Sequence, residues 1–203
     1  MPLIKYNNQS LSSITALPSA IPTGKLKLIS SQTASNSASI SFTSGLNSTY
    51  KVYKFVFVNM KPATDGTHFS FNLSTDSGSN YNVTKTTTHF QAFHTESGAS
   101  AVLTYDGDHD LAQSTSYQRI AFDIGNGSDE SASGEMFLFN PASTTYVKHF
   151  IAKNNTYKNV DRSQNSFMAG YGNTTSAVNA IRFQMESGNI SAGTIYLYAI
   201  DNS

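Results

Sequence analysis

The sequence predicts an all-β fold: a single antiparallel β-sandwich, jelly-roll-like, with about 10–12 strands and an extended N-terminal arm. Three observations carry this prediction. Apolar and polar residues alternate with a period of two along many short segments. Turn-forming residues, such as Ser97-Gly98, Asp106-Gly107 and Asn140-Pro141, separate these segments. No amphipathic stretch is long enough for a stable helix, which excludes βαβ architectures.

Residues 1–23 are expected to form the arm, because they lack this alternation and hold three of the five prolines. Proline fixes φ and removes a backbone donor, so the segment is a poor central strand. A frayed terminus is the simpler interpretation, whereas the spaced apolar residues favour an arm that docks on a neighbouring subunit. The residues of this predicted assembly arm are Leu3, Ile4, Tyr6, Leu11, Ile14, Leu17 and Ile21.

Residues 24–203 are expected to form one β-sandwich domain, because the alternation continues to the last strand without a linker. We expect the apolar face of each strand to be buried and the opposite face, rich in Ser, Thr, Asn, Gln, Lys and Arg, to contact water. In chain order, the expected buried residues are Leu26 and Leu28; Ile40 and Phe42; Tyr53, Phe55 and Phe57; Phe69 and Phe71; Ile120, Phe122 and Ile124; Phe137 and Phe139; Ile181, Phe183 and Met185; and Ile195 and Leu197.

The charge balance restricts the partners. Thirteen basic and thirteen acidic side chains cancel, and charged residues make up only 13% of the chain. A nucleic-acid binder needs an excess of Lys and Arg to displace counterions from phosphates, so we expect no nucleic-acid partner. No apolar run approaches the ~20 residues of a membrane span, and no signal peptide is evident, so we expect no membrane partner and synthesis in the cytoplasm. The absence of Cys excludes disulfides and thiolate metal sites.

The densest polar cluster is Asp106-Gly-Asp-His-Asp110. On an extended segment Asp106, Asp108 and Asp110 share a face, and carboxylates so placed could coordinate Ca²⁺. The cluster lacks the later Glu of a helix–loop–helix calcium loop, and it follows an apolar segment at 102–105. The simpler interpretation is therefore the solvated tip of a hairpin.

The histidines carry no metal or catalytic spacing. His68, His89, His94, His109 and His149 are dispersed, so a zinc site would have to be assembled from distant strands. We expect them to be hydrogen-bonded residues of the sheets. There is no Gly-x-Ser-x-Gly nucleophile motif, and nothing singles out a glycosidase pair among the acidic residues. We therefore expect no catalytic residue, no metal and no cofactor.

The aromatic residues comprise eleven Tyr and thirteen Phe, with no Trp. Core or inter-subunit packing is the simpler interpretation, since Tyr is enriched at protein interfaces. A carbohydrate-binding sandwich would instead stack sugars on exposed aromatic rings near turns. Four tyrosines lie near predicted turns and could serve either role: Tyr81, Tyr117, Tyr157 and Tyr171.

Four longer segments carry a family resemblance: GKLKLISSQTA at 24–34, FNLSTDSGSNYNV at 71–83, DLAQST at 110–115 and FNPASTTYVKHF at 139–150. Together they resemble a family of tailed-phage proteins, found in phages of marine bacteria and described as structural proteins. The resemblance extends over most of residues 24–200. It implies a virion component and supplies no catalytic motif.

These observations predict a non-enzymatic bacteriophage virion structural protein, made in the host cytoplasm, with other virion proteins as partners. Within the virion we expect a capsid decoration or cement protein that docks through its N-terminal arm and sheet edges. We also expect a homo-oligomer, for which a trimer is the natural arrangement. The alternative is a receptor-binding domain of a tail fibre or spike that recognises host surface glycans. A glycan-cleaving enzyme is a third hypothesis, which would require two converging carboxylates.

Overall fold

The structure, a computed structural model, describes residues 26–200, and they form twelve strands that pair antiparallel throughout. No helix in this range is long and apolar enough to cross a membrane. The strands are β1 (Leu26–Ser37), β2 (Ile40–Phe42), β3 (Val52–Pro62), β4 (Thr67–Ser74), β5 (Lys85–Thr95), β6 (Ala101–Tyr105), β7 (Gln118–Ile124), β8 (Ala132–Phe139), β9 (Lys148–Lys158), β10 (Arg162–Gly172), β11 (Ala180–Met185) and β12 (Ile190–Ile200).

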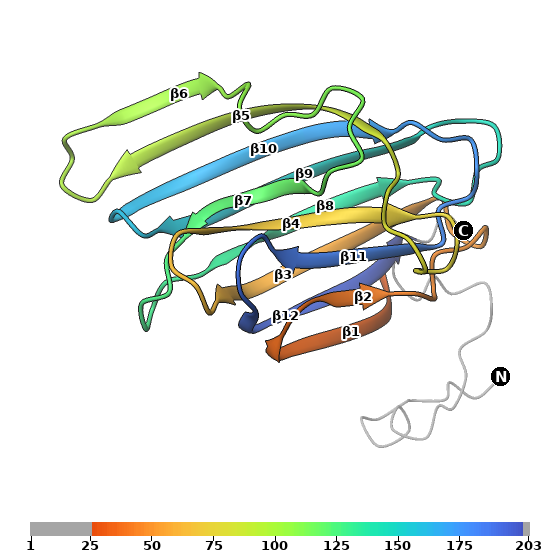
Figure 1. Cartoon of the computed structure of the whole chain (residues 1–203), viewed down its shortest axis with the longest axis horizontal. Coiled ribbons are helices and arrows are strands. Elements are labelled where there is room, and N and C mark those ends of the chain that lie inside the picture. The colour runs from red at the N-terminus through yellow and green to blue at the C-terminus, as the bar shows by residue number, and fades with distance from the viewer. Residues whose placement is uncertain (1–25, 201–203) are drawn as a thin grey trace, which may run out of the picture.

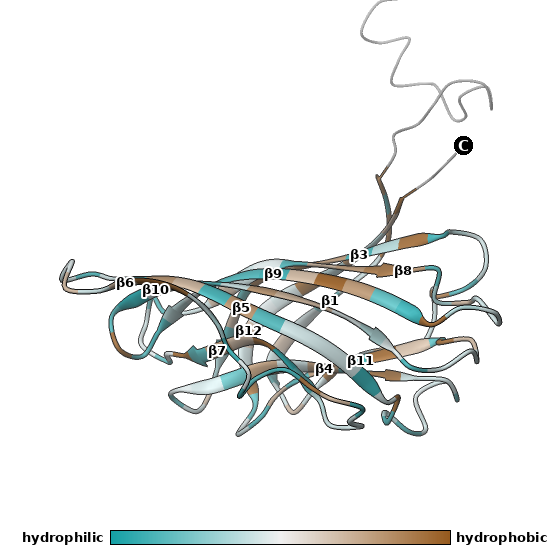
Figure 2. Cartoon of the chain, turned by 90° about the horizontal axis from the view of Figure 1, so that it is seen from above, coloured by the Kyte–Doolittle hydropathy of each residue, from teal (hydrophilic) through white to brown (hydrophobic). Residues whose placement is uncertain are grey.

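All strands belong to one hydrogen-bonded sheet, which folds over into two layers and is nearly closed, like a barrel (Figures 1 and 2). The larger layer has the order β1-β12-β3-β8-β9-β10-β5-β6, and the smaller layer has the order β7-β4-β11-β2. The layers join where Lys158, at the end of β9, pairs with Ile124 of β7. Figure 2 shows β4, β7 and β11 beneath the larger layer.

The all-β antiparallel prediction is confirmed for the described residues, and twelve strands agree with the expected number. The predicted assembly arm, residues 1–23, lies outside the described residues, so its boundary and its docking role stay predictions.

The core lies between the two layers and consists mainly of phenylalanines. Phe55 and Phe57 of β3 each meet Phe183 of β11 with ring centroids 5.2 Å apart. Phe71 of β4 meets Phe150 of β9 at 5.1 Å. Burial is confirmed for these predicted core residues: Ile40, Phe42, Tyr53, Phe55, Phe57, Phe69, Phe71, Ile120, Phe122, Ile124, Ile181, Phe183, Met185, Ile195 and Leu197.

Two pairs of predicted core residues were assigned to the wrong face. Phe137 and Phe139 of β8 are only partly buried, whereas their neighbours Met136 and Leu138 have no exposed surface. Both faces of β8 are apolar, so alternation alone does not say which one meets the smaller layer.

Leu26 and Leu28 of β1 are 49% and 51% exposed, so the prediction that they are buried is wrong. β1 is an edge strand, and its register against β12 shifts between Leu28 and Ser30. The intervening Ile29 packs against the core instead. A bulge of this kind reverses the facing of residues on its two sides.

The outer face of the larger layer, which points away from the smaller layer, is less polar than expected. Phe90 of β5 stacks on Phe167 of β10 with ring centroids 4.7 Å apart, and Tyr105 of β6 lies opposite Phe90. Ile151 of β9 and Phe137 of β8 lie opposite each other on the same face. We call this surface, defined by Leu103, Tyr105, Phe90, Phe167, Ile151 and Phe137, the outer aromatic face.

Candidate functional site

The chain that follows β6 turns back along β5 and forms a loop at residues 106–117. Asp106 N–H donates to the His89 carbonyl at 3.0 Å, and Thr87 N–H donates to the Leu111 carbonyl at 2.9 Å. The next strand, β7, does not pair with β6. The prediction that Asp106–Asp110 forms a hairpin tip is therefore wrong, because backbone hydrogen bonds to β5 hold this loop against the sheet.

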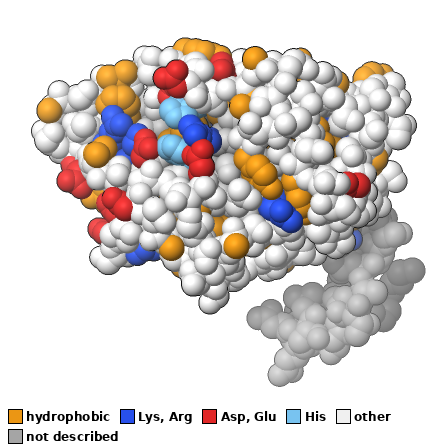
Figure 3. All heavy atoms as spheres, viewed as in Figure 1, with side chains coloured by type: hydrophobic (Ala, Val, Ile, Leu, Met, Phe, Trp, Pro, Cys, Tyr) orange, Lys and Arg blue, Asp and Glu red, His pale blue; other side chains and the backbone are white. Residues whose placement is uncertain are grey.

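The loop brings together three histidines that are far apart in the sequence. His89 of β5 stacks on the Phe122 ring at 4.5 Å, and the His109 ring meets the edge of Phe122 at 4.6 Å. His68 of β4 lies 5.7 Å from the same ring. On the space-filling surface, histidines appear among acidic and basic side chains on this face (Figure 3). These three residues come from β4, β5 and the loop, so the fold assembles them from distant parts of the chain.

Asp106 connects two of the histidines. Its Oδ2 atom lies 2.8 Å from Nδ1 of His109 and 3.8 Å from Nδ1 of His89. Gln91 Nε2 donates to the same oxygen at 2.8 Å. The carboxylate is therefore held between two imidazole rings by a side chain from β5.

His89 is fully buried, and neither of its ring nitrogens has a hydrogen-bond partner. Burial lowers its pKa to about 4, against the opposing effect of the Asp106 carboxylate. The ring is therefore neutral at neutral pH and carries an available lone pair. The expectation that the histidines are hydrogen-bonded fails here.

His68 has a different environment. Asp123 N–H donates to His68 Nδ1 at 3.0 Å, and His68 Nε2 lies 3.7 Å from a Glu186 oxygen. Burial also lowers the pKa of His68. Its Nδ1 already accepts a hydrogen bond, and its ring meets the His109 ring edge-on with centroids 5.8 Å apart.

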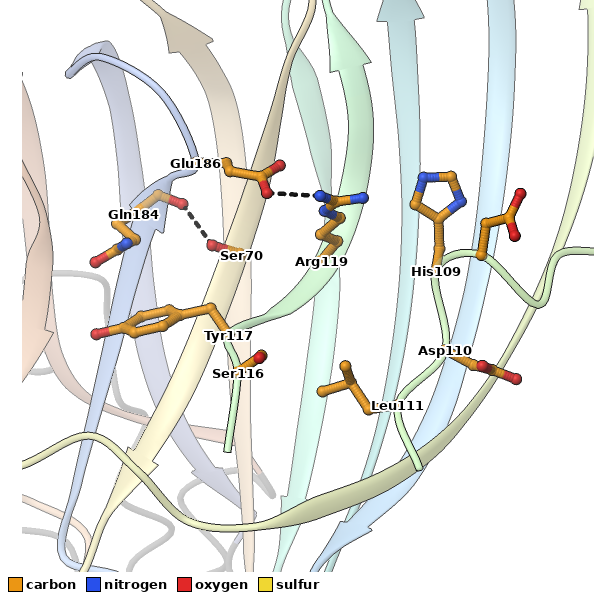
Figure 4. A pocket seen from close by; sticks show the side chains of 10 residues that line it. Ser70, His109, Asp110, Leu111, Ser116, Tyr117, Arg119, Gln184 and Glu186 are labelled. Atoms are coloured by element: carbon orange, nitrogen blue, oxygen red, sulfur yellow. Dashed lines mark hydrogen bonds and ion pairs between the residues drawn. The ribbon is translucent and has the colours of Figure 1, made fainter. Parts of the chain in front are cut away.

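A cavity of about 420 Å³ adjoins the cluster. In Figure 4, Arg119 and Glu186 form an ion pair on one side, and His109 and Asp110 stand on the other. The Arg119–Glu186 distance is 2.5 Å. The lining residues are Ser70, Asp108, His109, Asp110, Leu111, Ser116, Tyr117, Arg119, Gln184 and Glu186.

The structure brings together two of the four tyrosines selected from the sequence. Tyr117 lines the cavity, and burial raises its pKa while nearby Arg182 opposes that rise. The Arg182 guanidinium lies 4.0 Å from the Tyr81 ring centroid. Tyr157 lies in a separate depression, where a hydrogen bond to Glu96 raises its pKa to about 12, and Tyr171 pairs with His149 beside the outer aromatic face.

The three loop aspartates do not converge. Asp110 accepts a hydrogen bond from the Tyr105 hydroxyl, Asp108 is exposed, and Asp106 faces the histidines. Within residues 26–200, the one group of three or more His, Asp or Glu residues whose ligand atoms lie within 4.8 Å of one another is His89, Asp106 and His109. Two imidazole nitrogens and one carboxylate oxygen suit a first-row transition metal better than Ca²⁺.

The sequence contained one signal for this cluster. A hairpin that turns at the predicted Ser97-Gly98 turn places residues 89 and 106 opposite each other, and the β5–β6 register extends to this pair. The spacing of histidines along the chain could not reveal it, because His109 reaches the cluster only when the loop folds back.

Comparison with known proteins finds no matching family model, no matching curated protein and no matching solved structure.

Proposed function

We propose that this chain is a non-enzymatic structural protein of a bacteriophage virion, and specifically a capsid decoration protein that docks through its arm and its sheet edges. The observation that carries the docking proposal is the open edge at β6. The resemblance of the four segments to tailed-phage structural proteins supports the placement in a virion. The proposal includes the jelly-roll-like arrangement predicted from the sequence, which is common in capsid domains.

β6 offers both apolar side chains and free backbone groups. All five of its residues are exposed, with Leu103 at 72% and Tyr105 at 58%. It pairs only with β5, so its other side has no strand partner among the described residues. Such an edge is a template for an added strand from another subunit.

The alternation of hydrogen bonds between β5 and β6 identifies which backbone groups of β6 point away from β5. Thr95 N–H donates to the Ser100 carbonyl, and Asp106 N–H donates to the His89 carbonyl. Antiparallel pairs alternate between bonded and non-bonded, so Leu103, opposite Ala92, directs its N–H away from β5. This N–H is available to an incoming strand.

The partner that we propose for this edge is a strand of another virion subunit, seated so that its side chains meet the outer aromatic face. Phe90 and Ile151 on that face are 44% and 51% exposed. Aromatic residues of this kind are enriched in protein interfaces. The net charge of zero fits an attachment that depends on apolar contact and neutral hydrogen bonds, with little effect of salt.

The test is incorporation into particles of the phage that encodes the chain, measured by quantitative mass spectrometry. Copy numbers on the order of hundreds support decoration, whereas roughly a dozen indicate the tail. Leu103→Pro removes the outward N–H without breaking the β5–β6 ladder, and Leu103→Ala removes only the apolar side chain. We expect the proline variant to fold normally but incorporate less than the alanine variant.

Deletion of residues 2–22 tests the arm in the same particles, and we expect a folded chain that no longer incorporates. If both the deletion and Leu103→Pro incorporate at the level of the unmodified chain, the docking proposal is wrong. Absence of the chain from purified particles contradicts the virion proposal itself.

A second candidate, glycan recognition by a tail fibre or spike domain, is favoured by the cavity beside the histidines. Tyr117 provides an aromatic ring there, and Arg119, Gln184 and Glu186 provide polar groups for hydroxyls. We expect Tyr117→Ala to abolish any signal of the full chain on an array of host envelope glycans. Tyr146→Ala, at a residue 68% exposed and outside the cavity, is the matched control. Binding that survives Tyr117→Ala contradicts this assignment.

A further inference from the structure

We propose that His89, Asp106 and His109 form a binding site for a divalent transition-metal ion of the zinc type, with one coordination position left to a ligand from the adjoining cavity. This site is independent of the docking surface, because its three residues do not belong to the outer aromatic face or to the β6 edge.

The first argument is the donor set. Nδ1 of His89 and Nδ1 of His109 approach the same carboxylate oxygen, at 3.8 and 2.8 Å. Zn²⁺ bonds of about 2.0–2.2 Å to nitrogen and oxygen place neighbouring ligand atoms about 3.3 Å apart in a tetrahedral site. Both distances lie within about 0.5 Å of this value, and all three ligand atoms lie within 4.8 Å of one another, so small side-chain rotations can accommodate the ion. Hard cations such as Ca²⁺ and Mg²⁺ prefer six or more oxygen ligands, which these residues do not provide.

The second argument is the unpartnered histidine. His89 has no exposed surface, and both of its ring nitrogens lack a hydrogen bond. Buried polar atoms in folded proteins nearly always have a partner, and an orphan points to a missing ion or water. His89 Nδ1 is aimed at Asp106, so an ion between them would give this nitrogen its partner.

The third argument is the support around the ligands. The His89 ring is held flat against Phe122, with an interplanar angle of 22°. Gln91 holds Asp106, and Gln118 Nε2 donates to the His109 carbonyl at 3.0 Å. Ligands fixed by outer hydrogen bonds in this way are typical of metal sites.

The position of the ligands indicates what the ion does. His89 belongs to β5, whereas Asp106 and His109 belong to the returning loop. A bound ion therefore ties the loop at residues 106–117 to the sheet. His109 also lines the cavity, so an oxygen or nitrogen atom of a cavity ligand can reach the remaining coordination position.

The experiment uses the full chain, freed of metal by a chelator, with Zn²⁺ alone as the probe. Competition with a chromophoric chelator gives stoichiometry and affinity, and thermal unfolding gives stabilisation. We expect one Zn²⁺ per chain and a raised Tm, while Ca²⁺ and Mg²⁺ have no effect. At a free Zn²⁺ concentration 100 times the dissociation constant, the folded state should be favoured roughly 100-fold.

The variants separate this site from surface binding. His109→Asn changes a partly exposed ligand and should fold, and we expect its Zn²⁺ affinity to fall at least roughly tenfold. His89→Gln should have the same effect, and Gln91→Ala a smaller one. His149→Gln, which removes an exposed histidine outside the cluster, should bind like the unmodified chain. No saturable Zn²⁺ binding, or equal affinity in His109→Asn and the unmodified chain, would overturn the proposal.

Discussion

Lys85 begins β5 with its ammonium group removed from water. It has no exposed surface, and its Nζ donates to Asn72 Oδ1 at 2.6 Å and to the Val83 carbonyl at 2.8 Å. Both acceptors are neutral, so hydrogen bonds alone offset the cost of burying the charge. Burial lowers the pKa of Lys85 from 10.5 to about 7.

Because of this lowered pKa, the stability of the fold changes with pH in the alkaline range. Between pH 7 and 10.5 the unfolded chain retains a proton on Lys85 that the folded chain has lost, so the free energy of unfolding rises with pH. The slope is at most about 1.4 kcal/mol per pH unit. Below pH 7 both states are protonated, and the penalty of the buried charge is constant.

We expect Lys85→Met to remove this slope, because methionine fills a similar volume without a titrating group. Urea unfolding of both proteins at several pH values from 6 to 10 measures the difference. The free energy of unfolding of the variant should exceed that of the unmodified chain by the smallest amount at the alkaline end of this range. Parallel profiles would show that Lys85 titrates at its ordinary pKa in the folded protein.

At the scale of strands, the alternation of apolar and polar residues correctly predicts which side chains are buried wherever only one face of the strand is apolar. β11 is such a case, since Ile181 and Phe183 alternate with the polar Arg182 and Gln184. β8 reads Met-Phe-Leu-Phe from 136 to 139, so both registers have equal hydrophobicity. Which face of β8 is buried depends on the side that the smaller layer covers, and this is set by tertiary structure.

The candidate metal centre, too, could be predicted only in part from the sequence. The predicted turn at Ser97-Gly98 is sufficient to place His89 opposite Asp106, so this half of the cluster was accessible from the sequence. His109 joins it through loop hydrogen bonds to Thr87 and Lys85, which no local pattern indicates. Burial of His89 without a partner is visible only in three dimensions.

At the scale of the whole molecule, one aromatic residue connects the two layers. Phe183 of β11 is fully buried and its ring contacts five other phenylalanine rings from β2, β3 and β4. Among residues 26–200, strand pairing joins the layers only at the β7–β9 junction. Elsewhere, packing of side chains such as Phe183 must hold them together.

We expect Phe183→Ala to lower the free energy of unfolding by about 3–5 kcal/mol, since the five surrounding rings cannot collapse into the space left behind. Phe137→Ala is the matched control: the same substitution on the outer aromatic face, where the ring is only partly buried, should cost about 1 kcal/mol. Urea denaturation monitored by tyrosine fluorescence and by circular dichroism measures both. Because the layers belong to one sheet, both probes should report a single transition in each variant. Equal losses in the two variants would mean that the layers are not held together by the phenylalanine core.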